Sequence, residues 1–205
     1  MGQLDGHTAI VTGGATGPGR RIASALAQAG ARVLIADPDA AAAERLADRL
    51  GGLSLGADLS RETEAAALAY HASDALGETD ILVNTAPCDG FDAPSLGRFD
   101  LLTAQALRPL FLALQHLVPG MVARGSGLVL NVAPALSTPL WGPAVAAWTG
   151  AATRALAAEL RGSGLRANAL VPGTDIASDP GLSAVALCVR PDATDVILDY
   201  RTEPA

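Results

Sequence analysis

The chain has 205 residues and a formal net charge of −7, and 50% of its residues are hydrophobic. This length predicts a single domain, residues 1–205, with a sizeable buried core. The acidic balance and the lack of a basic run argue against nucleic-acid binding. Glycine, proline or charge interrupts the long apolar stretches, and the N-terminus has no signal-peptide pattern, so we expect no membrane helix and a cytoplasmic location.

Short apolar runs alternate with longer segments rich in Ala, Leu, Arg and Glu. The runs are continuous rather than alternating, which is typical of strands buried on both faces. About seven strands are predicted, at Thr8–Thr12, Arg32–Ala36, Leu53–Gly56, Asp80–Asn84, Gly127–Val132, Arg166–Val171 and Asp195–Leu198. Helices are predicted at Arg20–Ala29, Ala40–Leu50, Glu62–Leu76, Arg98–Arg124, Ala144–Arg161 and Ala184–Val189. This order predicts an α/β fold, a three-layer doubly wound parallel sheet of the Rossmann type.

Two features are expected to interrupt this regular order. Pro109 and Pro119 should kink or end the fourth helix, because proline lacks the N–H group that the helix needs. The segment Thr174–Leu182 is rich in Gly, Pro, Asp and Ser and is predicted to be a loop.

A glycine-rich turn follows the first predicted strand, from Thr12 to Gly19, and leads directly into the first helix. Glycines let the backbone turn tightly and approach a pyrophosphate, and the helix N-terminus then offers N–H groups to the anion. The placement between strand and helix makes this a candidate dinucleotide site. Its candidate binding residues are Thr12, Gly13, Gly17, Pro18 and Gly19.

Two carboxylates follow the next strands. Asp37 comes 18 residues after Gly19, where a carboxylate can bind ribose hydroxyls and repel a 2′-phosphate, which favours NAD over NADP. The alternative is a turn or helix N-cap residue before Pro38. Asp58 follows the third strand and is a candidate for the adenine amino group. Its alternative is an N-cap of the third helix, shared with Ser60.

Several ordered motifs resemble the short-chain dehydrogenase/reductase family over residues 5 to about 175. The family's TGxxxGxG motif matches Thr12 to Gly19, and its strand-three aspartate matches Asp58. Its NNAG motif is approximated from Asn84 to Pro87, and its N-x-x-x-P-G pattern matches Asn168 to Gly173. The resemblance implies a Rossmann fold, a bound nicotinamide dinucleotide and further cofactor contacts at Asn84, Ala86, Pro172 and Gly173.

The family's catalytic Asn, Ser, Tyr and Lys are not conserved at the matching positions. The asparagine position is Ala106, the serine position is Pro134 or Ala135, the tyrosine position is Trp148 and the lysine position is Ala152. All 14 basic residues are arginine, so no alignment supplies the lysine. In the family the tyrosine moves the proton, whereas an indole is only a hydrogen-bond donor. The segment after Gly173 is also too short for the family's usual substrate lid, which weakens water exclusion.

Few residues are candidates for a replacement chemistry. Ser137 follows the lost serine, and Asp89 follows the fourth strand, but each has an ordinary loop role as its alternative. The cysteines and the histidines lack the spacing of a metal site, and none is expected; they are Cys88, Cys188, His7, His71 and His116.

These observations predict a dinucleotide-binding protein without standard redox catalysis, most simply a non-catalytic partner subunit. It would form a homo-oligomer, or a hetero-oligomer with a related family member, through the helices Arg98–Arg124 and Ala144–Arg161. One alternative is a repurposed non-redox enzyme of the cyclase, dehydratase or isomerase type in a biosynthetic pathway, with NAD kept as a structural group or absent. A further alternative is an atypical NAD-dependent oxidoreductase whose proton comes from another donor, such as water. A small-molecule ligand fits each of the enzyme alternatives.

Overall fold

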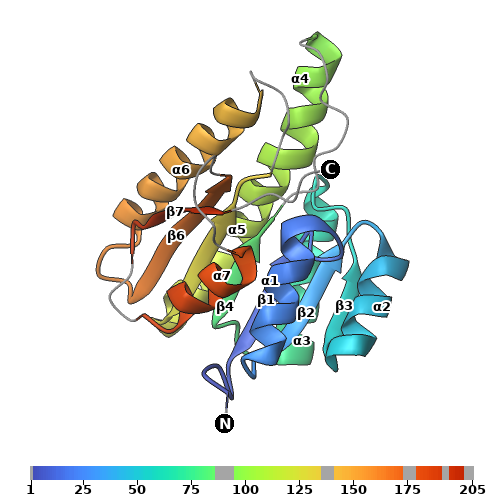
Figure 1. Ribbon diagram of the computed structural model, residues 1–205, viewed down its shortest axis with the longest axis vertical. Helices are drawn as coiled ribbons and strands as arrows, with labels where there is room; N and C mark the ends of the chain where they lie inside the picture. The colour runs from blue at the N-terminus through green and yellow to red at the C-terminus, as the bar shows by residue number, and fades with distance from the viewer. Residues whose placement is uncertain (1, 86–94, 135–140, 173–178, 191–193, 201–205) are drawn as a thin grey trace.

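The computed structural model describes residues 2–85, 95–134, 141–172, 179–190 and 194–200. Within them, seven parallel strands form one sheet in the order β3-β2-β1-β4-β5-β6-β7 (Figure 1). The strands are β1 Thr8–Thr12, β2 Arg32–Asp37, β3 Leu53–Gly56, β4 Ile81–Asn84, β5 Gly127–Val132, β6 Leu165–Pro172 and β7 Ile197–Tyr200. The predicted doubly wound parallel sheet is confirmed.

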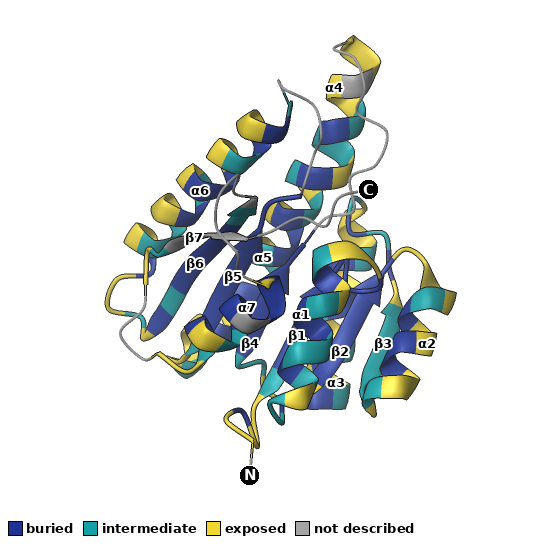
Figure 2. Ribbon diagram, viewed as in Figure 1, coloured by how far each residue is buried: buried dark blue, intermediate teal, exposed yellow. Residues whose placement is uncertain are grey.

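Helices cover both faces of this sheet. They are α1 Gly17–Gln28, α2 Ala40–Leu50, α3 Glu62–Leu76, α4 Leu96–Leu102, the π-helical turn η1 Thr103–Leu107, α5 Arg108–Arg124, α6 Trp141–Glu159 and α7 Pro180–Cys188. Apolar side chains of α1, α2 and α7 share one core cluster with the sheet, and those of α3, α5 and α6 share the other. Figure 2 shows buried strands between helices whose outer faces are exposed.

The predicted fourth helix differs from the observed one in its middle. The helical path runs from Leu96 to Arg124, but the five residues of η1 are π-helical, and Pro109 lies in the first turn of α5 directly after them. A π-helical turn widens the helix, and such turns frequently occur at functional sites. Pro119 lies inside α5 without ending it, contrary to one of the two expected effects.

The C-terminal elements are displaced from their predicted bounds. Helix α7 begins at Pro180, within the segment predicted as a loop, because proline is well suited to the first turn of a helix. Strand β7 spans Ile197–Tyr200, so it begins and ends two residues later than predicted. Helix α7 packs against α1 and so extends the helical layer on that face of the sheet.

One helical stretch, Phe99–Arg124, is long and apolar enough to cross a membrane by length and composition. It contributes five buried residues to the core cluster beneath α3, namely Leu112, Ala113, Leu117, Val118 and Met121. A helix that packs in a protein core passes the same test, so this finding is weak evidence for a membrane span.

Candidate functional site

Buried polar residues gather at the carboxyl edge of the sheet, where β1, β2, β4 and β5 end. Thr12, Asp37, Asn84, Thr85 and Asn131 are each at most 8% exposed. In open parallel sheets, ligands bind at this edge, where neighbouring connections leave on opposite faces. The candidate site therefore lies between the end of β1 and the end of β4.

The glycine-rich turn is held by close backbone contacts. Gly13 and Gly17 have φ values of +59° and +50°, which L side chains rarely adopt. A Cβ atom on Gly19 would lie 2.3 Å from the carbonyl oxygen of Gly13 and 2.7 Å from Thr85 Oγ1. Thr85 Oγ1 lies 2.7 Å from Thr12 O and 2.9 Å from Gly13 O, so it donates across from β4 to this turn.

The N-terminus of α1 suits a bound anion. Thr16 is the N-cap residue, but its side chain makes no capping hydrogen bond, and the first turn of the helix contains no acidic residue. A Cβ atom on Gly17 would meet nothing within 4 Å, so the space beside it is open. Backbone N–H groups at a free helix N-terminus attract phosphate. The predicted pyrophosphate site at Gly17 to Gly19 therefore fits the geometry.

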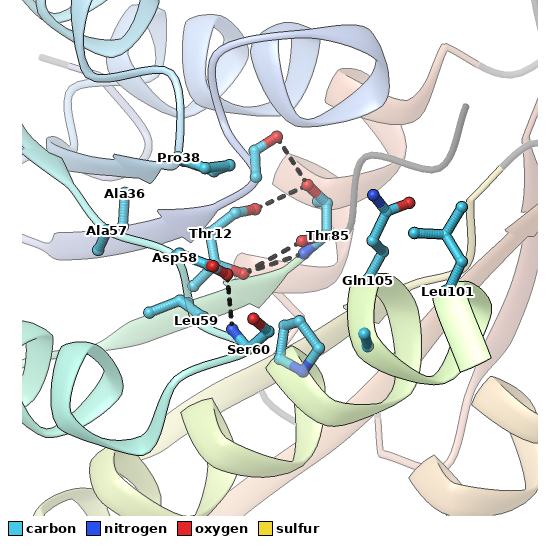
Figure 3. A pocket seen from close by; sticks show the side chains of 13 residues that line it. Thr12, Ala36, Pro38, Ala57, Asp58, Leu59, Ser60, Thr85, Leu101 and Gln105 are labelled. Atoms are coloured by element: carbon cyan, nitrogen blue, oxygen red, sulfur yellow. Dashed lines mark hydrogen bonds between the residues drawn. The ribbon is translucent and has the colours of Figure 1, made fainter. Parts of the chain in front are cut away.

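A pocket of about 410 Å³ opens beside this turn (Figure 3). Its walls come from the ends of β1, β2, β3 and β4 and from the helix containing η1. The lining residues are Thr12, Gly13, Ala36, Pro38, Ala57, Asp58, Leu59, Ser60, Thr85, Leu101, Ala104, Gln105 and Pro109. The mixture of apolar walls with a few polar groups is typical of a small-molecule or cofactor site.

Asp37 is only 3% exposed, and its two oxygens have different partners. Oδ2 accepts a hydrogen bond from the backbone N–H of Ala15 at 3.0 Å, and Oδ1 accepts one from Asp39 at 3.0 Å. The structure thus shows the turn role for Asp37, and it also ties the glycine-rich turn to β2. A carboxylate has further lone pairs, so its contact with a ribose stays a prediction.

Asp58 lines the pocket, but it does not cap α3. The N-cap residue of α3 is Arg61, while Asp58 Oδ1 accepts a hydrogen bond from Ser60 N at 3.0 Å in the turn before the helix. Arg61 Nε lies 3.5 Å from Asp58 Oδ2, and Asp58 N donates to Glu64 Oε2 at 2.6 Å. The alternative of a shared N-cap with Ser60 is therefore wrong, because the helix begins later.

The positions that match the family tetrad are apolar or outward-facing. Ala106 is buried in η1, Pro134 is buried just after β5, and Ala152 is half-buried on α6. Trp148 is 36% exposed, so much of its indole contacts solvent. A cavity of only about 10 Å³ is lined by Ala106, by Pro134 and by Thr149, the residue after Trp148 on α6.

Other predicted residues lie outside the described part of the chain: Ala86, Asp89, Ala135, Ser137 and Gly173. Pro172 is the last residue of β6 and is paired in register with Tyr200. Among the described residues there is no group of three or more His, Cys, Asp or Glu side chains arranged for a metal.

Sequence reasoning missed a buried polar chain behind the site. Asn84 Nδ2 donates to Asn131 Oδ1 at 3.0 Å, and Asn131 Nδ2 donates to Thr153 Oγ1 at 3.0 Å. The available signal was an asparagine near the end of an otherwise apolar strand, at both Asn84 and Asn131. Thr153, on α6, carried no comparable signal, because threonine is common on helices facing a sheet.

Comparison with known proteins gives consistent matches. The short chain dehydrogenase family pattern matches residues 7–178. Galactitol 2-dehydrogenase from Cereibacter sphaeroides is 35% identical over 184 residues, which is 83% of this chain and 72% of the relative. D-threitol dehydrogenase from Mycolicibacterium smegmatis is also 35% identical, over 83% of this chain and 70% of the relative.

A solved structure gives the same result. The 3-ketoacyl-(acyl-carrier-protein) reductase from Brucella melitensis, complexed with NADH, has a TM-score of 0.85 and 28% identity. The match covers 97% of this chain and 98% of that chain.

The predicted function, a dinucleotide-binding protein without redox catalysis, is wrong in the light of these relatives. They are named as dehydrogenases and a reductase, which points to oxidoreductase function. The prediction gave too much weight to the missing tyrosine and lysine. Those residues handle the proton, whereas hydride transfer depends on the dinucleotide and on how it is held.

The family pattern, the sheet topology and the geometry of the glycine-rich turn all indicate the same family. The chain belongs to the short chain dehydrogenase family.

Proposed function

We propose that this chain is an oxidoreductase that uses a nicotinamide dinucleotide to interconvert an alcohol and a carbonyl compound. The observation that carries the proposal is the open N-terminus of α1 beside the 410 Å³ pocket, which together suit a pyrophosphate and an adenosine. The relatives named for galactitol and threitol support a substrate with hydroxyl groups. When bound, the dinucleotide would supply or accept the hydride.

The residues of the pocket have distinct roles in this proposal. The turn from Gly17 to Gly19 would bind the pyrophosphate through backbone N–H groups. Asp58, Ser60 and Gln105 would offer polar contacts to the adenosine between the apolar walls of the pocket. The buried carboxylate of Asp37, at the end of β2, would oppose a 2′-phosphate by charge, which favours NAD over NADP.

The proton needs a different source from the family's tyrosine. The chain contains no lysine to lower the pKa of a tyrosine, and its tyrosines are Tyr70 and Tyr200. Tyr70 is 78% exposed on α3, away from the carboxyl edge of the sheet. In this proposal water is the proton donor and acceptor, which is compatible with a short segment after Gly173 in place of the family's lid.

We further propose that the chain is cytoplasmic and assembles, with a second copy or a related chain, through α5 and α6. Large apolar side chains are exposed on these helices: Phe111 at 61%, Val122 at 40% and Trp148 at 36%. A patch of exposed apolar side chains is typical of a subunit interface, and these residues are the candidates for one. Sedimentation of the purified chain as a monomer at every concentration would contradict self-association.

Cofactor choice is tested by calorimetry with NAD and NADP. The wild type should bind NAD at least about tenfold more tightly than NADP, a difference of about 1.4 kcal/mol. Asp37→Asn should reduce this preference, because it removes the charge while keeping an acceptor at the same place. Asp39→Asn is the matched control, since Asp39 caps α2 and asparagine caps equally well. An unchanged preference in Asp37→Asn would refute the role of Asp37.

Oxidoreductase activity is tested by following NADH absorbance with sugar alcohols, hydroxysteroids and the corresponding carbonyl compounds. Turnover with at least one of these classes is expected, and it should be slow, since general acid catalysis contributes about 10²–10⁴-fold. If NAD binds by calorimetry but no compound is turned over in either direction, the proposed activity fails while dinucleotide binding stands.

A further inference from the structure

The cavity of about 10 Å³ lies at the carboxyl ends of β4 and β5, apart from the large pocket. Its walls come from β4, η1, α5, β5 and α6. The lining residues are Asn84, Thr85, Ala106, Leu110, Val132, Pro134, Val145 and Thr149. Thr85 lines both this cavity and the 410 Å³ pocket, so the two are neighbours. A volume of about 10–15 Å³ is what one water molecule requires.

The buried polar chain ends at this cavity. Its members are nearly inaccessible to solvent: Asn84 is 1% exposed, Asn131 and Thr153 are 0% exposed, and Thr149 is 2% exposed. Thr153 Oγ1 donates to the backbone carbonyl of Thr149 at 2.7 Å. The chain therefore runs from Thr149 O on α6 through Thr153 and Asn131 to Asn84 on β4.

The direction of every hydrogen bond in this chain follows from its first member. A backbone carbonyl can only accept, so the hydroxyl of Thr153 must donate to it and is left as an acceptor. Asn131 must then present its NH₂ group to Thr153 and its oxygen to Asn84. Asn84 in turn must donate through Nδ2 to Asn131. The carbonyl oxygen of Asn84 is thus the atom left without a partner in the chain.

Asn84 Oδ1 is buried and receives no hydrogen bond from the described part of the protein. Of the residues around the cavity other than Asn84, only Thr85 and Thr149 carry a hydroxyl; Thr85 Oγ1 donates to Thr12 O or Gly13 O, and neither hydroxyl bonds to Asn84 Oδ1. Buried polar atoms in native proteins are almost always satisfied, by protein or by ordered water. A cavity of about 10 Å³ has room for one water molecule as that donor.

We propose that Asn84 Oδ1 binds a single ordered water molecule in this cavity. The site does not depend on the dinucleotide and goes beyond the proposed function. The cavity is lined by Ala106 and Pro134, whose apolar side chains stand at the positions of the family's asparagine and serine. Asn131 and Thr153 are positioning residues, because they orient the Asn84 amide so that its oxygen faces the water.

The matched pair Ala106→Thr and Ala106→Val tests this proposal. Both side chains are β-branched and similar in volume, and only threonine adds a hydroxyl. If a water donates to Asn84 Oδ1, the threonine hydroxyl can take the place of that water. Valine expels the water and leaves the oxygen without a donor. The threonine variant should therefore melt about 2–4 °C or more above the valine variant. Equal stability, or a more stable valine variant, would overturn the proposal.

A crystal structure of the wild type provides a test that needs no variant. It should show one water within hydrogen-bond distance of Asn84 Oδ1, with Asn84 Nδ2 directed to Asn131. Oxygen-17 relaxation dispersion should detect one more long-lived internal water in the wild type than in Ala106→Val. An empty cavity, or a protein donor on Asn84 Oδ1, would rule out the water site.

Discussion

At the residue scale, close contacts of small residues determine the conformation of the glycine-rich turn from Thr12 to Gly19. Gly19 lies so close to the carbonyl oxygen of Gly13 that no side chain fits between them. Thr85 reaches from β4 to the same turn and donates to Thr12 O or Gly13 O. Asp37 holds the opposite side of the turn through Ala15 N. The shape of the site therefore depends on small groups from three strands.

Gly19→Ala should disturb this turn. The new Cβ would lie 2.3 Å from a backbone oxygen, so the backbone must shift, at a cost of about 1–3 kcal/mol. The melting temperature should fall by several degrees, and dinucleotide affinity should fall with it. Thermal denaturation and calorimetry measure the two effects.

Gly97→Ala is the matched control, because Gly97 also lies in a helix but a Cβ there would meet nothing within 4 Å. That variant should be as stable as the wild type or up to about 1 kcal/mol more stable. Equal melting temperatures for Gly19→Ala and Gly97→Ala would show that the close packing at Gly19 is not required.

At the element scale, the end of α5 is tied to the start of β4 at the edge of the sheet opposite the site. Arg124 Nη2 donates to Thr79 O at 2.6 Å and to Ser126 O at 3.0 Å. The same atom lies 3.3 Å from Asp80 Oδ1, and the Arg124 side chain is only 17% exposed. Asp80 Oδ2 in turn accepts from Thr8 N at 2.8 Å, which extends this connection to β1.

Arg124→Ala should destabilise the protein by about 1–3 kcal/mol, because it leaves a half-buried carboxylate and two carbonyls without their donor. Denaturant unfolding measures this change. Arg154→Ala is the comparison, since Arg154 is 61% exposed and its nitrogen lies 3.9 Å from Asp195. A pair of that kind contributes about 1 kcal/mol at most. Similar losses in both variants would mean that the Arg124 contacts are no stronger than a surface pair.

At the scale of the whole molecule, stability depends on two apolar layers around a buried sheet. Helix α7 closes one layer by packing on α1, and Cys188 at its end is partly buried against that core. Burial raises the pKa of the Cys188 thiol to about 12, although the nearby Arg166 lowers it in part. The native state therefore keeps its proton to a higher pH than the unfolded chain does.

This difference predicts how stability depends on alkaline pH. Below pH 9, the ordinary value for the thiol, both states hold the proton and the thiol has no pH effect. Between pH 9 and about 12, only the unfolded state ionises, so the free energy of unfolding falls by up to about 1.4 kcal/mol per pH unit. Cys188→Ala should lose less stability over this range in denaturant titrations. Parallel curves for the two proteins would contradict the shifted pKa.

The chain fold could be predicted because its signals are local. Six of the seven strands follow their predicted bounds within one residue at each end, since continuous apolar runs between helical segments are visible in sequence order. The glycine-rich turn from Thr12 to Gly19 was predicted for the same reason. The bounds of α7 and β7 were less accurate, because short elements near the end carry weak periodicity.

The sequence by itself determined a doubly wound parallel sheet, a glycine-rich turn after β1 and the complete lack of lysine. Only the tertiary structure decided which polar groups meet. Asp37 contacts Ala15 from 22 residues away. Asn84, Asn131 and Thr153 come from β4, β5 and α6, and their hydrogen bonds leave Asn84 Oδ1 without a partner among the described residues. Local patterns specify strands and turns, whereas the partner of a buried polar atom depends on elements brought together from distant parts of the chain.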